Sequence, residues 1–202
     1  GTITDIMPGI YTPRTEQALA SVSGFEFSLV HRTVFVYGAL MAEEALEALL
    51  MRSGGATARI RAKRAARVFG YGRYCMLNNP LPAALPAGAE ASIDGLLLER
   101  LQPSEVRAID AFYNSGTMCF DRIAVAVAVE NGFGGVEEIE ALMYVCPAAL
   151  AGETLREPLQ EWRYPPFISD HLQAVIETII RPTRRQFDED EGAAHTAAVE
   201  MQ

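Results

Sequence analysis

Short segments of apolar or alternating residues, bounded by turn residues, recur along the chain and predict five β-strands. They cover residues 33–37, 65–77, 92–99, 122–130 and 138–146. The last two are the clearest pair, because isoleucine and valine alternate with alanine in 122–130 and a glycine-rich turn leads straight back. This pattern predicts a β-hairpin with its branched side chains on one face.

In three places after or between these strands, the spacing of apolar residues predicts a helix. Residues 42–53 place four apolar side chains on one face, and residues 102–114 begin with Pro103, which suits a first helical turn. A third helix is predicted after Ser169 as N-cap and is expected to stop at Pro182. Residues 78–88 contain three prolines and are expected to be a loop rather than a regular strand.

The order of these elements predicts the fold class. Strands and helices do not alternate strictly, which favours an α+β fold over a doubly wound parallel sheet. We expect a small closed or barrel-like, mostly antiparallel or mixed β-sheet with flanking helices. Residues 33–181 would form this domain, 1–32 an N-terminal extension, and 182–202 a charged, flexible tail.

The charge of the chain limits its partners. The 202 residues carry a formal net charge of −9, which argues against general nucleic-acid binding. The segment 59–67 is nevertheless basic and is followed by three aromatic residues, so an RNA-binding face is an alternative. Basic residues that alternate with small apolar ones are more typical of a solvated strand face. We therefore expect no nucleic-acid partner.

Cysteine and histidine spacing predicts no metal or cofactor. The three cysteines have no CxxC spacing and the three histidines no metal-ligand spacing. Unpaired cysteines suggest a reducing compartment, and no apolar run reaches the roughly 20 residues of a membrane helix. A cytoplasmic location with no membrane association is the expectation.

The segment VFVYGALM, residues 34–41, contains the main candidate site. A strand, a glycine turn and a helix start leave backbone N–H groups without partners, and such groups favour an anion. Gly38 would permit close approach of a ligand or a left-handed turn. An ordinary strand-to-helix connection is the alternative for this short motif.

Several motifs in order resemble the gamma-glutamylcyclotransferase-like superfamily, and most closely its avirulence-induced-gene-like branch. VFVYGALM is similar to the family's YGSL or YGTL loop, and IDGLLLERLQPSEVRAIDAF to its strand and helix ending in D-x-F. ARVFGYGRYCMLNNPLPAALPAG resembles the stretch that leads into the YPAI segment. DRIAVAVAV and EWRYPPFISDHLQAVIETI resemble the strand and closing helix that follow, so the similarity covers about residues 33–181.

The resemblance implies a reaction and a pocket. In this family the α-amino group of a γ-glutamyl substrate attacks its own γ-carbonyl and releases 5-oxoproline and an amine. It implies that Tyr37, Gly38, Ala39, Leu40 and Met41 bind a small molecule with a carboxylate, and that a glutamate acts as general base or acid.

The chain departs from the family where that glutamate is expected. The position after Phe112 is Tyr113, and a tyrosine with an ordinary pKa near 10 is neutral at pH 7. Asp110 is expected to brace the helix, Asp121 could fold back as a replacement base, and Glu99 would have to point inward. The serine of YGSL is Ala39 here, which removes one side-chain donor and leaves the backbone donors.

Three functions remain open on this basis. The chain could be a cyclotransferase acting on γ-glutamyl or γ-glutamylamine-type substrates. It could be a non-catalytic binding or regulatory module that keeps the fold without the base. It could also be an interaction protein that uses its acidic tail. A carboxylate beside residues 37–40 would favour the first, and a pocket lined by Tyr113 without a carboxylate would favour the second.

Overall fold

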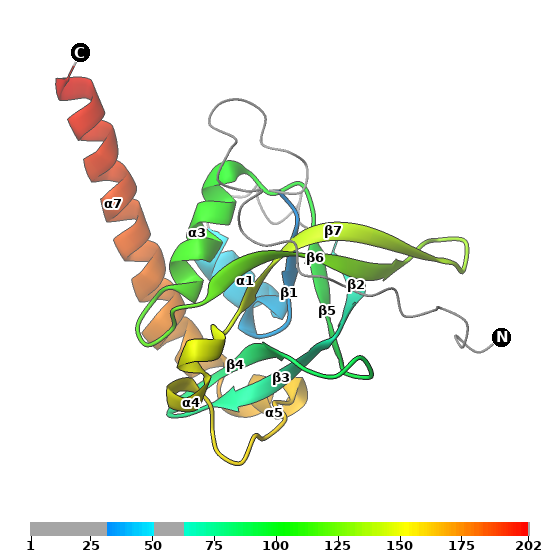
Figure 1. Cartoon of the computed structure of the whole chain (residues 1–202). Helices are drawn as coiled ribbons and strands as arrows, with labels where there is room; N and C mark the ends of the chain where they lie inside the picture. The colour runs from blue at the N-terminus through cyan, green and yellow to red at the C-terminus, as the bar shows by residue number, and fades with distance from the viewer. Residues whose placement is uncertain (1–31, 51–62, 202) are drawn as a thin grey trace.

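Five strands close into a barrel in the computed structural model, which describes residues 32–50 and 63–201 (Figure 1). The strands follow the order β1–β5–β2–β6–β7 around the barrel. Their bounds are Val34–Val36 (β1), Arg64–Phe69 (β2), Ser92–Leu98 (β5), Asp121–Glu130 (β6) and Val136–Val145 (β7). The predicted N-terminal extension, apart from Arg32, lies outside the described residues.

The short strand β1 closes the barrel. It pairs antiparallel with β5 on one side, and on the other side Val34 lies opposite Leu142 of β7 in a parallel bridge. The Leu142 N–H donates to the Thr33 carbonyl at 2.9 Å across this seam. The hairpin of β6 and β7 is in register over all ten pairs, from Asp121 opposite Val145 to Glu130 opposite Val136. The predicted mixed, barrel-like α+β fold is confirmed.

The predicted strand 65–77 is two strands in two sheets, which corrects the prediction of one continuous strand. The chain breaks at Gly70, which has φ +82°, a conformation that glycine adopts without strain. After this turn β3 (Tyr71–Met76) leaves the barrel and pairs with β4 (Asn79–Pro86) in a separate two-stranded sheet.

The prediction of a loop at residues 78–88 was wrong, because the prolines of β4 occupy positions that a strand tolerates. Pro82, Ala84 and Pro86 alternate along β4, so their backbone groups point to the same side of the strand. The Ala84 carbonyl points away from β3, because it accepts from the Cys146 N–H at 3.0 Å. By the alternation of an antiparallel ladder, the N–H groups that these prolines lack would also point away from β3. The β3–β4 pairing therefore loses no hydrogen bond to Pro82 or Pro86.

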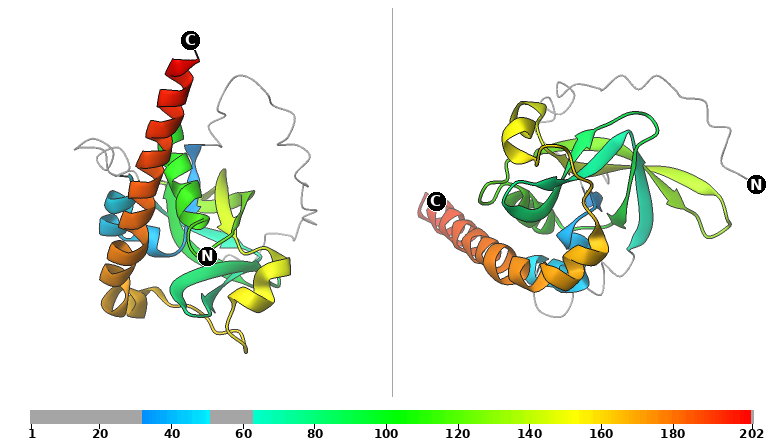
Figure 2. Two further views of the ribbon diagram at one scale, coloured as in Figure 1. Left: turned by 90° about the vertical axis from the view of Figure 1, so that its left-hand side faces the viewer. Right: turned by 90° about the horizontal axis from the view of Figure 1, so that it is seen from below.

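Helices cover one side of the barrel (Figure 2). Pro103 does begin α3, and Val106, Ile109, Phe112 and Tyr113 are buried, as their spacing predicts. The helical bounds are Ala39–Met41 (η3), Glu43–Leu50 (α1), Pro103–Tyr113 (α3), Ala148–Leu150 (η4), Ala151–Thr154 (α4), Tyr164–Asp170 (α5), Leu172–Val175 (α6), Ile176–Ile180 (η5, a π-helical turn) and Arg181–Glu200 (α7).

The C-terminal segment is helical where the sequence predicts a helix stop and a flexible tail. Pro182 does not end the helix, because it lies in the first turn of α7, where its missing N–H needs no partner. Phe187 is buried and α7 packs against α1 and α3 before it extends past them (Figure 1). Ser169 is also not an N-cap, since α5 begins five residues earlier at Tyr164.

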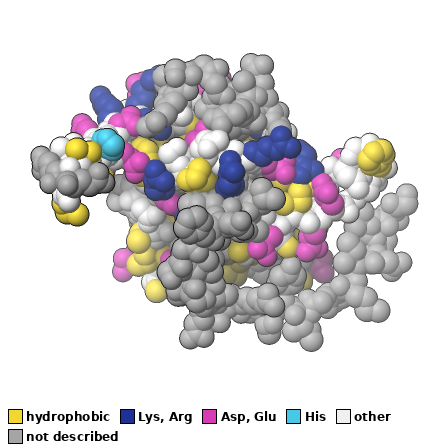
Figure 3. Space-filling model, turned by 90° about the horizontal axis from the view of Figure 1, so that it is seen from above, with side chains coloured by type: hydrophobic (Ala, Val, Ile, Leu, Met, Phe, Trp, Pro, Cys, Tyr) yellow, Lys and Arg dark blue, Asp and Glu magenta, His cyan; other side chains and the backbone are white. Residues whose placement is uncertain are grey.

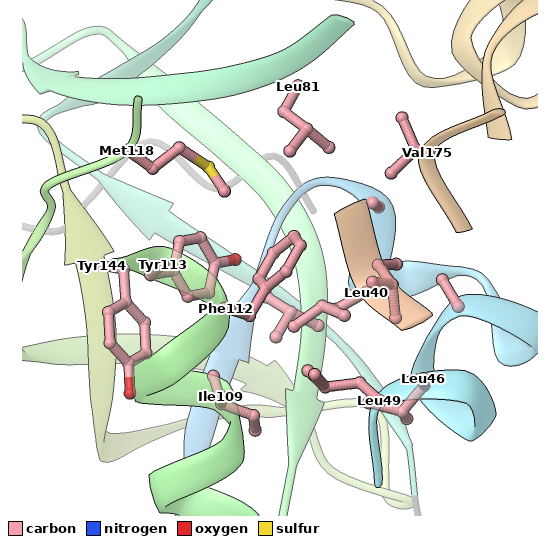
Figure 4. Packing of buried hydrophobic residues seen from close by; sticks show 14 of the residues in the cluster. Leu40, Leu46, Leu49, Leu81, Ile109, Phe112, Tyr113, Met118, Tyr144 and Val175 are labelled. Carbon is pink, nitrogen blue, oxygen red and sulfur yellow. The ribbon is translucent and has the colours of Figure 1, made fainter. Parts of the chain in front are cut away.

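Two groups of buried residues make up the core. One fills the barrel and includes Phe35, Tyr37 and Val127. The other joins the outside of the barrel to the helices, and it includes Leu40, Phe112 and Tyr113 (Figure 4). The candidate site lies in this second cluster, between the end of β1 and the end of α3.

Gly95 on β5 tests the barrel closure. A Cβ at this position would lie 2.3 Å from the Val36 carbonyl oxygen and 2.7 Å from the Phe35 ring, so β1 and β5 approach each other closely here. We expect Gly95→Ala to lower the free energy of unfolding by about 1–3 kcal/mol or more, because backbone must move. Gly88→Ala is the matched control, since nothing lies within 4 Å of its added Cβ. Equal urea midpoints for the two variants would contradict this account of the barrel.

Candidate functional site

The chain leaves β1 through a tight turn at Gly38. The first turn after Gly38 is the 3₁₀ helix η3, in which the Met41 N–H donates to the Gly38 carbonyl at 3.0 Å. Among the described residues, the N–H groups of Gly38, Ala39 and Leu40 have no hydrogen-bond acceptor. These donors are the feature that the sequence predicts for an anion site.

Gly38 is required by its close neighbour on β4. Its φ of −133° is negative, so the left-handed turn considered from the sequence is not present. A Cβ here would lie 2.8 Å from Pro82 Cγ. The absence of a side chain therefore lets β4 approach the loop closely.

Tyr37 and Arg73 hold the start of the loop from two sides. The Tyr37 ring is buried in the barrel, and its hydroxyl donates to the Tyr144 carbonyl at 2.6 Å. The Tyr37 carbonyl accepts from Arg73 Nη1 at 2.7 Å. The Arg73 guanidinium lies over the Trp162 ring, 4.9 Å from its centroid. The peptide before Gly38 is thus fixed by a hydrogen bond at each end of Tyr37.

A small pocket lies beside the loop and contains no carboxylate. Its lining residues come from the loop, β4, the end of α3 and the segment after α3, namely Gly38, Ala39, Leu81, Pro82, Phe112, Tyr113 and Met118. The space that solvent can occupy is about 10 Å³, room for about one water molecule. Of the predicted ligand-binding residues, Gly38 and Ala39 line the pocket, whereas Leu40 is buried in the core and Tyr37 in the barrel.

Tyr113 contributes the pocket's one polar side chain. Its ring is 4 % exposed and stacks on Tyr144, with centroids 4.2 Å apart and planes 8° apart, while Phe120 stacks on it at 5.8 Å. Burial raises the pKa of Tyr113 well above its ordinary value, so the phenol is neutral at physiological pH. Its hydroxyl makes no hydrogen bond to the described residues and is available to a ligand.

Asp110 lies one helical turn before Tyr113 but is bound to other groups. Its Oδ2 accepts from Arg122 Nη1 at 2.7 Å, and its Oδ1 accepts a short hydrogen bond from the Tyr144 hydroxyl. Burial raises the pKa of Tyr144, and the Asp110 carboxylate raises it further. Asp110 therefore connects α3 to β6 and β7, the bracing role that the sequence predicts.

The other acidic candidates lie outside the pocket. Asp121 is the exposed first residue of β6, opposite Val145, and does not line the pocket. Glu99 pairs with Arg64, with Oε1 2.8 Å from Nη2. Neither carboxylate reaches the loop in this conformation.

Sequence reasoning did not identify Met118 as a pocket residue. It lies in the segment 114–120 between α3 and β6, which is longer here than the family resemblance would suggest. Met118 is buried, whereas Thr117 and Cys119 beside it are exposed. An apolar residue flanked by polar ones in an inserted loop is the signal that could have identified it.

The arginines of the basic segment that the structure describes are engaged in ion pairs. Arg64 pairs with Glu99 and Glu137, and Arg67 Nε lies 2.6 Å from Asp94. Figure 3 shows basic and acidic side chains next to one another on the upper face. This arrangement is that of a solvated strand face.

Other kinds of site have little support in the described residues. No group of three histidine, cysteine or acidic side chains there could hold a metal ion. None of the helices described has the length and apolar composition needed to cross a membrane.

Residues 34–164 match the family described as gamma-glutamyl cyclotransferase, AIG2-like. The chain belongs to this family. No curated protein matches it.

Solved structures with a similar fold have low sequence identity. Two Arabidopsis thaliana proteins are each 19 % identical to this chain. The first has a TM-score of 0.49, and the match covers 73 % of this chain and 87 % of that protein. The second has a TM-score of 0.47, and the match covers 79 % of this chain and 84 % of that protein. A mouse AIG2-like protein is 17 % identical, with a TM-score of 0.40 over 65 % of this chain and 87 % of its own.

Tyr144→Phe tests the hydrogen bond beneath the pocket. The substitution removes the donor to Asp110 and keeps the ring stacked on Tyr113. We expect the free energy of unfolding to fall by about 0.5–1.5 kcal/mol, or more because the acceptor is charged. Tyr164→Phe is the control, since its hydroxyl has no hydrogen bond among the described residues. Equal urea midpoints would show that the network does not stabilise the fold.

Proposed function

We propose that this gamma-glutamylcyclotransferase-like chain binds a small carboxylate ligand in the pocket beside Gly38 and turns over γ-glutamyl substrates weakly or not at all. It is a binding or regulatory module with the family's fold. One observation carries the proposal: no carboxylate lines the pocket, and Tyr113 occupies the position where the family's motif has glutamate.

The chemistry of 5-oxoproline release requires a base. The attacking α-amino group is an ammonium at neutral pH and must lose a proton before it can attack the γ-carbonyl. Tyr113 cannot accept that proton, because its phenol is neutral and its pKa is raised further by burial. Asp110 is bound to Arg122 and Tyr144.

The groups that remain suit binding. The free N–H groups of Gly38, Ala39 and Leu40 can donate to a carboxylate, and the Tyr113 hydroxyl can donate to a carbonyl. With no carboxylate in its lining, the pocket has no negatively charged partner for an ammonium group. We therefore infer a ligand with a carboxylate and a neutral acceptor, such as 5-oxoproline.

The activity prediction is that the purified protein releases little or no 5-oxoproline from γ-glutamyl dipeptides or γ-glutamylamines. A positioned general base contributes about 10²–10⁴-fold, and Tyr113→Glu should recover part of that factor. Tyr113→Gln is the matched control, because it has nearly the same shape without the basic carboxylate. Circular dichroism establishes that both variants fold before turnover is compared.

The opposite pattern would identify Asp121 as a relocated base. Robust turnover by the wild-type protein that is abolished by Asp121→Asn and unaffected by Tyr113→Phe would contradict the proposal. The chain would then be an active cyclotransferase.

The binding prediction concerns the charge of the ligand. Calorimetric titration should show tighter binding of 5-oxoproline than of glutamate, by about tenfold or more, because the ammonium of glutamate would lose water without gaining a partner. Equal affinities, or tighter binding of glutamate, would show that an unassigned acidic group faces the ligand.

A further inference from the structure

The side chains that line the pocket leave little space in it, and Met118 is one of them. Met118, Phe112 and Tyr113 line it, and their side chains lie close to one another (Figure 4). With about 10 Å³ of space for solvent, the pocket cannot admit a ligand as large as 5-oxoproline without movement of a lining residue.

Six of the seven lining residues are held by their surroundings. Gly38 and Ala39 are fixed by the turn after β1, and Leu81 and Pro82 belong to the paired strand β4. The rings of Phe112 and Tyr113 are at the end of α3 and contact each other edge to face at 5.0 Å. Moving any of them would disturb a strand, a helix or a ring stack.

Met118 is held differently. It lies in the irregular segment between α3 and β6, where its N–H donates to the Ser115 carbonyl at 3.0 Å. Met118 belongs to no helix or strand, and the segment on either side of it is tied to α3 by hydrogen bonds from the Ser115 N–H to the Phe112 carbonyl and from the Phe120 N–H to the Tyr113 carbonyl. A methionine side chain has three rotatable bonds and adapts readily to a change in the space around it.

We propose that Met118 is a gate that occupies the ligand pocket and sets the size of molecule it admits. This inference rests on the proposed function, because it concerns the same pocket. In the closed arrangement the side chain fills the space between Tyr113 and Leu81. Its rotation toward solvent opens room for a ligand at the free N–H groups of the loop.

The gate predicts that shortening the side chain strengthens binding. If the open arrangement is the minor one, the apparent dissociation constant exceeds the intrinsic one by the inverse of the open fraction. We expect Met118→Ala to bind 5-oxoproline about tenfold more tightly than the wild-type protein, measured by calorimetry.

A matched control separates gating from loss of a buried side chain. Met143 is fully buried on β7 in the other core cluster and does not line the pocket. Met143→Ala should lower the melting temperature at least as much as Met118→Ala and leave the dissociation constant unchanged. A gain of affinity in both variants would attribute the effect to general loosening and would overturn the gate.

A crystal structure of Met118→Ala, determined under xenon pressure, tests the gate without the ligand. An enlarged pocket holding xenon between Leu81, Phe112 and Tyr113 is expected, because an apolar cavity of this kind takes up xenon. A pocket that remains closed in Met118→Ala would overturn the gate. If the wild-type protein binds 5-oxoproline, an equal affinity of Met118→Ala for 5-oxoproline would also overturn it. If the pocket enlarges but no variant binds 5-oxoproline, the proposed ligand is wrong and Met118 still closes the pocket.

Discussion

The close approach of β1 to the strands around it determines where the pocket forms. This strand has three residues, all fully buried, and it joins β5 to β7 to close the barrel. Gly95 permits the contact on one side because any side chain there would meet the Val36 carbonyl. The turn at Gly38 then lies directly against β4. Pro82 occupies the space that a side chain at position 38 would need.

The second constraint comes from α3. Its last turn carries Phe112 and Tyr113 toward the loop, and Asp110 anchors that turn to β6 and β7. An acidic residue one turn away is thereby committed to the scaffold. The polar chemistry left in the pocket is a set of donors: backbone N–H groups on one side and a neutral phenol on the other. Under the proposed function, such a site holds a carboxylate and a carbonyl and does not take a proton from an ammonium.

Much of the fold could be predicted from local patterns, since the alternation in β6 and the facing residues of α3 are properties of neighbouring positions. The errors came from features that depend on distant partners. Pro82 and Pro86 of β4 are tolerated because their backbone nitrogens face away from β3, on the edge where the Ala84 carbonyl accepts from the Cys146 N–H. No local sequence pattern reveals which edge of a strand faces its partner. The helix at Pro182 likewise depends on where α7 begins, because Pro182 lies in the first turn of α7, and on the packing of α7 against α1 and α3.

The candidate site followed the same division. Gly38, Ala39 and Tyr113 were recognisable because motifs place them, whereas Met118 comes from an irregular segment whose path only the three-dimensional structure supplies. Whether Asp121 could reach the pocket was also a question of path, and the structure places it at the exposed start of β6.

A crystal structure of the wild-type protein with 5-oxoproline tests the central claim most directly. The account predicts the carboxylate against the N–H groups of Gly38, Ala39 and Leu40, with the lactam carbonyl accepting a hydrogen bond from the Tyr113 hydroxyl and Met118 turned aside. A ligand bound elsewhere with this loop empty, or one whose ring nitrogen contacts a carboxylate such as Asp121, would contradict it.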